Sequence, residues 1–395
     1  MPDGRRRDSP PACRVHGGCE RTLYRGAGNP DRLIVTDLPL QGGVRLSAQQ
    51  MAQAAALALG RRDFRAGELR VGIQSCDDSV VRTGLFDPAK CAANARAYAR
   101  DRRVIGVIGT LNSPCSLAAL PELAKAEGRP LAIVSPVNSY VGLTRRAADA
   151  PAGVLQSLYP GGRRHFARVY PTDDRQAVAL AELADELGAR RVAVLDDGDL
   201  LYGRSLADRF ARAARARGGE VVARHTWDPA ASSYRDLAIR VADSRPDAVY
   251  LGGVLNSNGA AVLRALRRRL GDEPEMLLSD GFTPTNRCAL LATLPGVDIE
   301  PSAIYTAEAT LVLLDAIARS DGTRAGVIDE LFGTSLRHGL TGSVRFDKRG
   351  DIAAPPITIL RIRPARPAEL RLMGSSPRPS AWQAVRGAPL EPLSD

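Results

Sequence analysis

Small polar residues follow two apolar segments in the first half of the chain, where they could form hydrogen bonds to a ligand. The segments, 104–109 and 131–134, are apolar throughout, as buried parallel strands require. Ligands of open parallel sheets lie beyond the carboxyl ends of the strands. The polar residues at these ends include Ser113, Ser135, Asn138 and Ser139. Hydroxyl and amide groups bind ligands but offer little reactive chemistry, so the pattern indicates a binding site rather than a catalytic one.

Two further residues, Tyr202 and Asp280, follow expected strands in the second half of the chain. If both halves contact one ligand, hydroxyl and backbone N–H groups would hold its carboxylate, and Asp280 would hold its ammonium group. Tyr202 would cover the apolar part of the ligand. Taken singly, Ser113 could instead cap the following helix, and Tyr202 and Asp280 could be turn residues. Together they predict a small zwitterionic ligand.

Strands and helices alternate in two successive arrays, which is typical of doubly wound α/β domains. In the first array we expect strands at 33–36, 69–73, 104–108 and 131–134, with helices near 47–60, 88–100 and 116–127. Ser47 and Gln50 have the spacing of a capping box at the first helix. In the second array we expect strands at 192–195, 221–222, 248–251 and 276–278, with helices around 180–187, 206–210, 232–243 and 263–270. A helix near 303–319 and a strand at 357–362 follow. The sequence predicts two Rossmann-like lobes with a hinge and a cleft between them.

The expected boundaries place two interleaved lobes between terminal extensions. Residues 1–32 are expected to be a flexible lead-in, and residues 364–395, rich in Pro, Arg and Ser, a disordered tail. The first lobe would span 33–167 and be completed by about 279–336, and the second would span 168–278 and be completed by about 337–363.

The formal charge of +10 does not by itself indicate nucleic-acid binding. Only three of the 54 basic residues are lysine, and the arginines are spread over alanine-rich helices such as 209–217, as on solvated helix faces. No nucleic-acid-binding motif accompanies them. Residues 1–32 could not form the helix-turn-helix of a transcription regulator. No apolar run is long enough for a transmembrane segment.

The motifs of a nucleotide-dependent enzyme, the main catalytic alternative, are absent from the sequence. Gln41-Gly42-Gly43 follows the first strand without a GxGxxG or GKS/T pattern, and there is no GxSxG. The four histidines and six cysteines lack zinc-site spacing, and residues 196–199 lack the spaced ligands of a calcium loop. We therefore expect no enzymatic activity, no cofactor and no metal site.

Two cysteines are placed for a disulfide. Cys76 lies at the end of an expected strand and Cys91 on the next helix, which could bring them within reach of each other. A disulfide would indicate an oxidising compartment. The first twenty residues carry positive charge but no apolar segment, which is not the pattern of a secretory signal. These two observations point in opposite directions and leave the localisation open.

Several segments in this order resemble the type I periplasmic binding proteins of the branched-chain amino-acid class, the substrate-binding components of ABC importers. The resemblance covers about 33–362 and rests on segments LPLQG, VIGVIGTLNSPCS, SPVNSYVGLT, FARVYPTDDRQA, VAVLDDGDLLYG, DAVYLGG and GLTGSVRFDKRGD. It implies a non-catalytic protein whose lobes close over an amino acid or similar solute. The partners would be ABC membrane subunits, or a signalling protein if the domain serves sensing, and the location would be extracytoplasmic.

The resemblance also implies roles for individual residues. Ser113, Val137 (through its carbonyl group) and Ser139 would contact the carboxylate and ammonium of the ligand, with Asn138 beside them. The second lobe would add Tyr202, Asp280 for the ammonium group, and Asp173 at the cleft edge. The chain departs from the family where Val254 replaces a second aromatic residue and where residues 283–303 leave little room for a further strand and helix.

Overall fold

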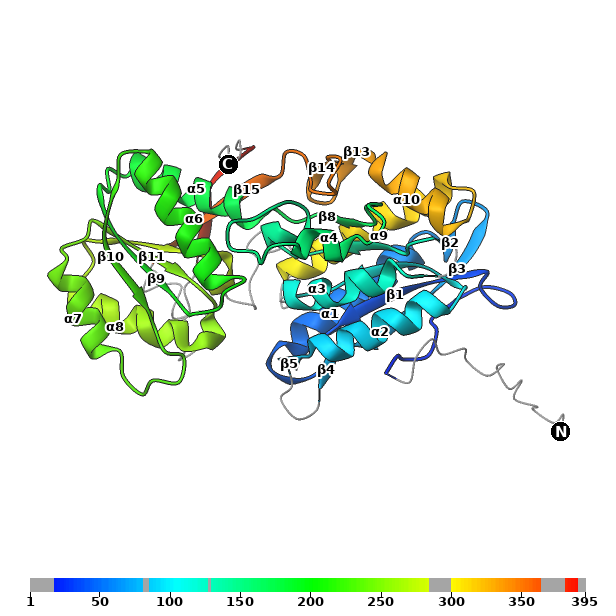
Figure 1. Ribbon diagram of the computed structural model, residues 1–395, viewed down its shortest axis with the longest axis horizontal. Helices are drawn as coiled ribbons and strands as arrows, with labels where there is room; N and C mark the ends of the chain where they lie inside the picture. The colour runs from blue at the N-terminus through cyan, green and yellow to red at the C-terminus, as the bar shows by residue number, and fades with distance from the viewer. Residues whose placement is uncertain (1–17, 81–84, 127–128, 284–299, 364–380, 390–395) are drawn as a thin grey trace. The chain divides into compact units, whose positions relative to one another are not determined.

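The computed structural model describes residues 18–80, 85–126, 129–283, 300–363 and 381–389 (Figure 1). The chain forms two compact units and passes between them several times. Unit 1 consists of Met1–Asn138, Gly153–Tyr170 and Ser302–Ile352, and unit 2 of Ser139–Ala152, Pro171–Pro301 and Ala353–Asp395. None of the described helices is long and apolar enough to cross a membrane.

Unit 1 is a sheet with helices on both faces. Its strands are β1 (Arg32–Leu38), β2 (Arg65–Ala66), β3 (Leu69–Asp77), β4 (Ser79–Val80), β5 (Leu85–Phe86), β6 (Val104–Gly109), β7 (Ala132–Ser135), β8 (Phe166–Arg168), β13 (Ser335–Gly339) and β14 (Gly342–Arg345). Its helices are η1 (Gly42–Val44), α1 (Arg45–Gly60), α2 (Pro88–Arg100), α3 (Ser113–Leu123), α4 (Val154–Leu158), α9 (Pro301–Arg319) and α10 (Arg324–Phe332). The sheet order is β2-β3-β1-β6-β7-β8.

The order of the parallel strands in unit 1 places a switch point between β1 and β6. All pairs among β3, β1, β6, β7 and β8 are parallel. After β1 the chain continues towards β3, whereas after β6 it continues towards β7, in the opposite direction across the sheet. The loops that follow β1 and β6 therefore diverge. Such a switch point is where ligands of doubly wound sheets bind.

The core of unit 1 explains why one helix can lie close to the sheet. Leu313 of α9 is fully buried, together with Ile105 and Ile108 of β6 and residues of α1 and α10. Between those two isoleucines lies Gly106, and a Cβ there would be 2.7 Å from the Leu313 side chain. The glycine therefore permits the close approach of α9 to β6.

Unit 2 repeats the architecture with fewer strands. Its strands are β9 (Arg191–Asp196), β10 (Glu220–Thr226), β11 (Ala248–Gly252), β12 (Glu275–Leu278), β15 (Pro356–Arg363) and β16 (Ala381–Pro389). Its helices are η2 (Val141–Leu143), α5 (Asp173–Glu186), α6 (Gly203–Ala216), α7 (Arg235–Asp243), η3 (Leu255–Gly259), α8 (Ala260–Leu270) and η4 (Asp280–Phe282). The parallel sheet has the order β10-β9-β11-β12.

Alternate residues of the central strands of unit 2 enter two separate cores. Val192 and Val194 of β9 pack with α5 and α6, whereas Ala193 and Leu195 pack with α7 and α8. Figure 1 shows these two helix pairs on opposite faces of the sheet. A strand buried on both faces must be apolar at every position, which is why residues 192–195 were recognisable from sequence.

The beginning and end of the chain differ from the sequence prediction. Within the expected flexible lead-in, Leu23 exchanges backbone hydrogen bonds with Ile73 of β3, at 2.8 and 3.0 Å. This pairing satisfies N–H and C=O groups on a strand edge that would otherwise be open. At the other end, β16 pairs antiparallel with β15 inside the expected disordered tail. Residues 1–17, 364–380 and 390–395 of these extensions, and residues 284–299 of the shortened segment, lie outside the described residues.

The predicted Cys76–Cys91 disulfide is wrong. Cys76 is joined to Cys19, and Cys91 of α2 is joined to Cys115 of α3. The Cys19–Cys76 bond depends on the pairing of the N-terminal segment with β3, which the prediction did not include. Cys91 instead faces the neighbouring helix, because α2 and α3 pack side by side, with a Cα–Cα distance of 5.4 Å at the two cysteines.

The division between the units also differs from the expected boundaries. Phe282 packs in the α7/α8 core, so the segment after β12 remains with unit 2 instead of completing the first lobe. Val344 and Phe346 pack in the core of unit 1, so 337–352 belongs there and not to the second lobe. The first helix, α1, begins at Arg45, which places Ser47 inside the helix and not at the predicted cap.

Candidate functional site

In unit 1 the loops after β6 and β7 are tied together by Asn138. Its side-chain amide donates to the carbonyl oxygens of Thr110 (3.0 Å) and Leu111 (3.1 Å), and its oxygen accepts from the Ser116 hydroxyl. Its backbone N–H donates to the Ser135 hydroxyl at 3.0 Å. Because the Asn138 side chain is buried and holds both loops, the structure gives it the role of setting their shape.

Ser113 and Val137 lie on these two loops. Ser113 is the first residue of α3, and the N-cap position is taken by Asn112, so the capping alternative for Ser113 is not realised. Val137 is half-buried against an apolar group formed by Leu38, Ala48, Met51 and Ala52. The predicted residues of unit 1 are therefore gathered at the carboxyl edge of β6 and β7.

In unit 2, Tyr202 and Asp280 are in direct contact. The Tyr202 hydroxyl donates to the Asp280 carboxylate and accepts from the backbone N–H of Gly281 at 2.8 Å. Gln176 of α5 donates to the same carboxylate oxygen at 2.7 Å. Tyr202 follows β9 and Asp280 follows β12, so these residues meet at the carboxyl edge of the sheet. Two donors fix the orientation of the carboxylate.

Ser139 and Asp173, the other predicted residues of unit 2, also lie next to each other. The backbone N–H of Asp173 donates to the carbonyl oxygen of Ser139 at 3.0 Å. Asp173 is the first residue of α5, and its side chain is fully buried. Its place at a cleft edge, which the resemblance implied, stays a prediction.

Asp197 shapes the same edge of unit 2. Burial raises the pKa of its carboxyl group, which accepts from the backbone N–H groups of Asp199 and Val254 at 3.2 and 3.3 Å. A Cβ on Gly253 would lie 2.7 Å from Asp197 Oδ2, and the φ of this glycine is +154°. The loop that carries Val254 is thus held by a carboxylate and requires glycine beside it.

Beneath the loops of unit 1 lie three aspartates. Burial raises the pKa of Asp37 to about 6, although Asn94 and Tyr98 donate to its carboxylate at 2.8 Å each. Burial and the neighbouring carboxylates raise the pKa of Asp78 to about 9. Burial alone would raise the pKa of Asp77, but hydrogen bonds from surrounding groups outweigh this effect, so the pKa of Asp77 is lowered.

One group of side chains among the described residues has the spacing of metal ligands. The ligand atoms of Asp78, Cys91 and Cys115 all lie within 4.8 Å of one another. The two sulfurs form a disulfide in this structure. A metal would need them as thiolates, so this arrangement does not hold one in the oxidised protein.

Sequence reasoning predicted Tyr202 and Asp280 as residues of this edge but did not include Gln176 or Asp197, which the structure places beside them. Gln176 lies on a helix, one turn beyond the predicted Asp173, and only the residues after strands were considered. The sequence did contain one signal for Gln176: it lies four residues after Thr172, the N-cap of α5, and so near the beginning of that helix. Asp197 was treated as part of a solvated turn, whereas its side chain is buried.

Comparisons with known proteins agree on the fold. The profile of the periplasmic binding protein family matches residues 38–287. A comparison with curated proteins finds no match. Among solved structures, the leucine-binding protein LivK of Thermotoga maritima superposes with a TM-score of 0.66 at 21% identity, covering 84% of this chain and 95% of that one.

Two further solved structures contain ligands. An ABC transporter substrate-binding protein of Desulfitobacterium hafniense in complex with Leu has a TM-score of 0.67 at 21% identity, covering 84% of this chain and 97% of its own. A solute-binding protein of an R. palustris ABC transporter in complex with 4-hydroxybenzoate has a TM-score of 0.68 at 14% identity, covering 91% and 98%. At these identities the likeness establishes the fold alone.

Proposed function

The chain belongs to the periplasmic binding protein family, and on that premise we propose that it is a non-catalytic solute-binding protein for a small amino-acid-like ligand. Residues of both units would contribute contacts, and binding would favour the ligand-closed arrangement over the open one. Import through ABC-type membrane subunits is the proposed role. A ligand-sensing role in a signalling protein would use the same binding step.

The observation that carries this proposal is the contact of Tyr202 and Gln176 with the Asp280 carboxylate in unit 2. Two neutral donors orient the carboxylate without neutralising its charge. A carboxylate held in this way at the carboxyl edge of a parallel sheet is suited to a ligand ammonium group. Tyr202 would at the same time offer its ring to the apolar part of the ligand.

The ligand carboxylate would be bound by the loops after β6 and β7. Ser113 lies at the beginning of α3, where backbone N–H groups and the helix dipole favour an anion. Ser139 and the carbonyl group of Val137 would complete the contacts. Asn138 would act indirectly, because its side chain holds the two loops in place.

A ligand panel tests the proposal. The purified protein is titrated by calorimetry with the common amino acids, with 4-hydroxybenzoate and with neutral sugars. At least one amino acid should bind. Asp280→Asn keeps the size of the side chain but removes its charge, and it should weaken that binding by about 2–5 kcal/mol, roughly thirtyfold to several thousandfold.

The exposed Asp272 offers a matched control. Asp272→Asn makes the same chemical change away from the sheet edge and should leave the dissociation constant within about twofold. Binding of 4-hydroxybenzoate but of no amino acid, unaffected by Asp280→Asn, would reject the ammonium contact. Unchanged amino-acid binding in a folded Asp280→Asn variant would reject the role of Asp280.

A further inference from the structure

Unit 1 contains a cavity of about 600 Å³ at the edge of the sheet opposite to the candidate site. Arg32 and Val104, which line it, are the first residues of the parallel strands β1 and β6. The candidate site lies at the carboxyl ends of the same sheet. The cavity is therefore a separate feature of this unit, and its chemistry is not explained by solute binding at the other edge.

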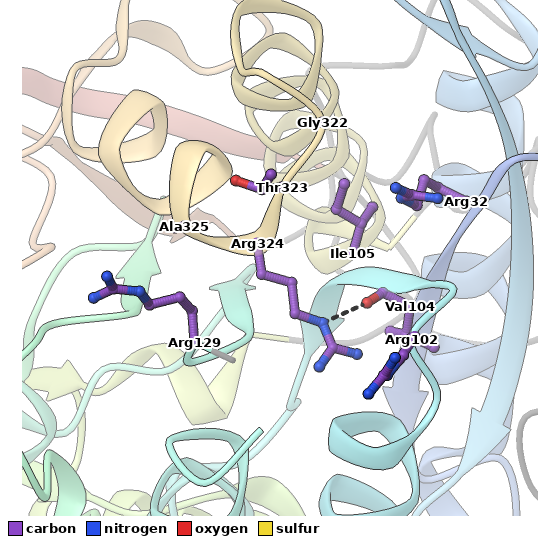
Figure 2. Close-up of a pocket in the computed structure, with 9 residues that line it drawn as sticks. All are labelled: Arg32, Arg102, Val104, Ile105, Arg129, Gly322, Thr323, Arg324 and Ala325. Carbon is purple, nitrogen blue, oxygen red and sulfur yellow. Dashed lines mark hydrogen bonds between the residues drawn. The ribbon is translucent and has the colours of Figure 1, made fainter. Parts of the chain in front are cut away.

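The cavity has four arginines and no acidic residue among the residues that line it. They are Arg32, Arg102, Arg129 and Arg324, and the other lining residues are Val104, Ile105, Gly322, Thr323 and Ala325. Figure 2 shows Arg32 and Arg129 on opposite sides of the cavity, with Ile105 and Thr323 between them. The nearest carboxylates form ion pairs with other arginines, Asp31 with Arg70 and Asp101 with Arg103. The charges of Arg32 and Arg324 also help to lower the pKa values of Asp31 and Asp101, respectively.

Arg324 has a structural role that leaves its charge in place. Its guanidinium group donates to the carbonyl oxygens of Tyr98, Ala99, Asp101 and Val104, at 2.6–3.3 Å. These carbonyl groups are neutral and do not cancel the positive charge of the guanidinium group. The four bonds hold the guanidinium group rigidly, which reduces the entropy lost when an anion binds beside it.

The N-terminus of α10 adds to the positive potential of the cavity. Thr323 is its N-cap, and the Thr323 hydroxyl accepts from the backbone N–H of Gly326 at 3.0 Å. The helix therefore begins at the cavity wall and directs the positive end of its dipole there. Helix N-termini and arginine side chains are both suited to phosphate oxygens, which several donors can bind at once.

We infer that this cavity binds a small, multiply charged phosphate anion. Figure 2 shows the exposed side chain of Arg129 pointing away from Arg32. Once this side chain turns inward, Arg32 and Arg129 would clamp the anion from opposite sides, with Arg324 and the first turn of α10 behind it. The volume is large enough for a nucleotide as well as for inorganic pyrophosphate.

The test compares two double variants with the same change in net charge. Arg32→Ala/Arg129→Ala removes the two proposed clamps. Arg212→Ala/Arg264→Ala removes two exposed arginines of α6 and α8 in unit 2. Each protein is titrated by calorimetry with inorganic pyrophosphate and with adenosine diphosphate at constant ionic strength in a phosphate-free buffer, and adenosine is the uncharged control.

Pyrophosphate should bind the wild type with one site per chain, and the cavity variant should weaken it roughly a hundredfold, since each lost charge-assisted bond costs about tenfold or more. The Arg212/Arg264 variant should bind within about twofold of wild type. If adenosine diphosphate binds more tightly than pyrophosphate, the ligand is an organic phosphate. If adenosine diphosphate does not bind, the ligand is an inorganic one. An equal loss in both variants, or no binding to wild type, would overturn the inference.

Discussion

Asp78 illustrates how a single residue can make this fold depend on pH. Its side chain is fully buried, and none of the described residues donates a hydrogen bond to its carboxyl oxygens. Burial and the charges of Asp37 and Asp77 raise its pKa to about 9. At neutral pH the folded protein therefore holds this proton, whereas the unfolded chain, with an ordinary aspartate pKa, has released it.

Asp78→Asn should therefore stabilise the protein at neutral and mildly alkaline pH. Between the two pKa values the folded state binds more protons than the unfolded state, so the free energy of unfolding falls as pH rises, by up to about 1.4 kcal/mol per pH unit. Asparagine removes this titration. Chemical denaturation from pH 5 to 9 should show a flatter dependence and a more stable variant at pH 8.

The exposed Asp272→Asn variant serves as the comparison for this measurement. It should follow the wild-type curve throughout. A pH dependence in Asp78→Asn as steep as that of wild type would mean that Asp78 is already ionised in the folded protein, and the proposed cause would be rejected.

At the scale of elements, the approach of α9 to β6 depends on a residue without a side chain. A Cβ at position 106 would lie 2.7 Å from Leu313, which is fully buried and cannot move into solvent. Adjacent isoleucines on β6 are buried as well. The helix or the strand would have to shift to admit even one methyl group.

Gly106→Ala should lower the free energy of unfolding by about 1–3 kcal/mol, the usual range for an overpacked core. Gly43→Ala is the control, because nothing lies within 4 Å of a Cβ at that position. Urea denaturation measures both. A Gly106→Ala variant as stable as wild type would show that α9 can move away from the sheet without loss.

For the whole molecule, the discontinuous construction of unit 1 gives one ion pair unusual importance. Arg168, at the end of β8, is fully buried and donates from Nε to Asp351 at 2.7 Å. The partners are 183 residues apart in the sequence. They join the middle segment of unit 1 to the segment that returns near the end of the chain.

Asp351→Asn should destabilise the protein by about 3–5 kcal/mol, because it leaves the Arg168 charge buried without its carboxylate. Asp329→Asn provides a control of the same chemistry. Its pair with Arg163 is exposed, with side-chain accessibilities of 72% for Asp329 and 31% for Arg163, and should contribute less than about 1 kcal/mol. Thermal and urea denaturation should show a much larger loss of stability for Asp351→Asn than for Asp329→Asn. Equal losses of stability would contradict the importance of the buried pair.

Local pattern was enough to predict much of the fold. Segments such as 104–109 and 192–195 are buried on both faces of a sheet, so every residue must be apolar, and such runs are visible in the sequence. Several short strands were not predicted in this way. Phe166–Arg168 ends in a buried arginine, and the β13–β14 hairpin is mostly exposed, so neither has an apolar pattern.

The sequence alone determined the α/β class, the alternation of strands and helices, and the placement of Tyr202 and Asp280 after strands, because these depend on neighbours along the chain. Only the tertiary structure decided which cysteines pair, that Gln176 joins Asp280, and that Arg168 meets Asp351. Each of these contacts joins residues that lie far apart in sequence. Their proximity follows from the order of the strands and the side-by-side arrangement of helices, and no local pattern records it.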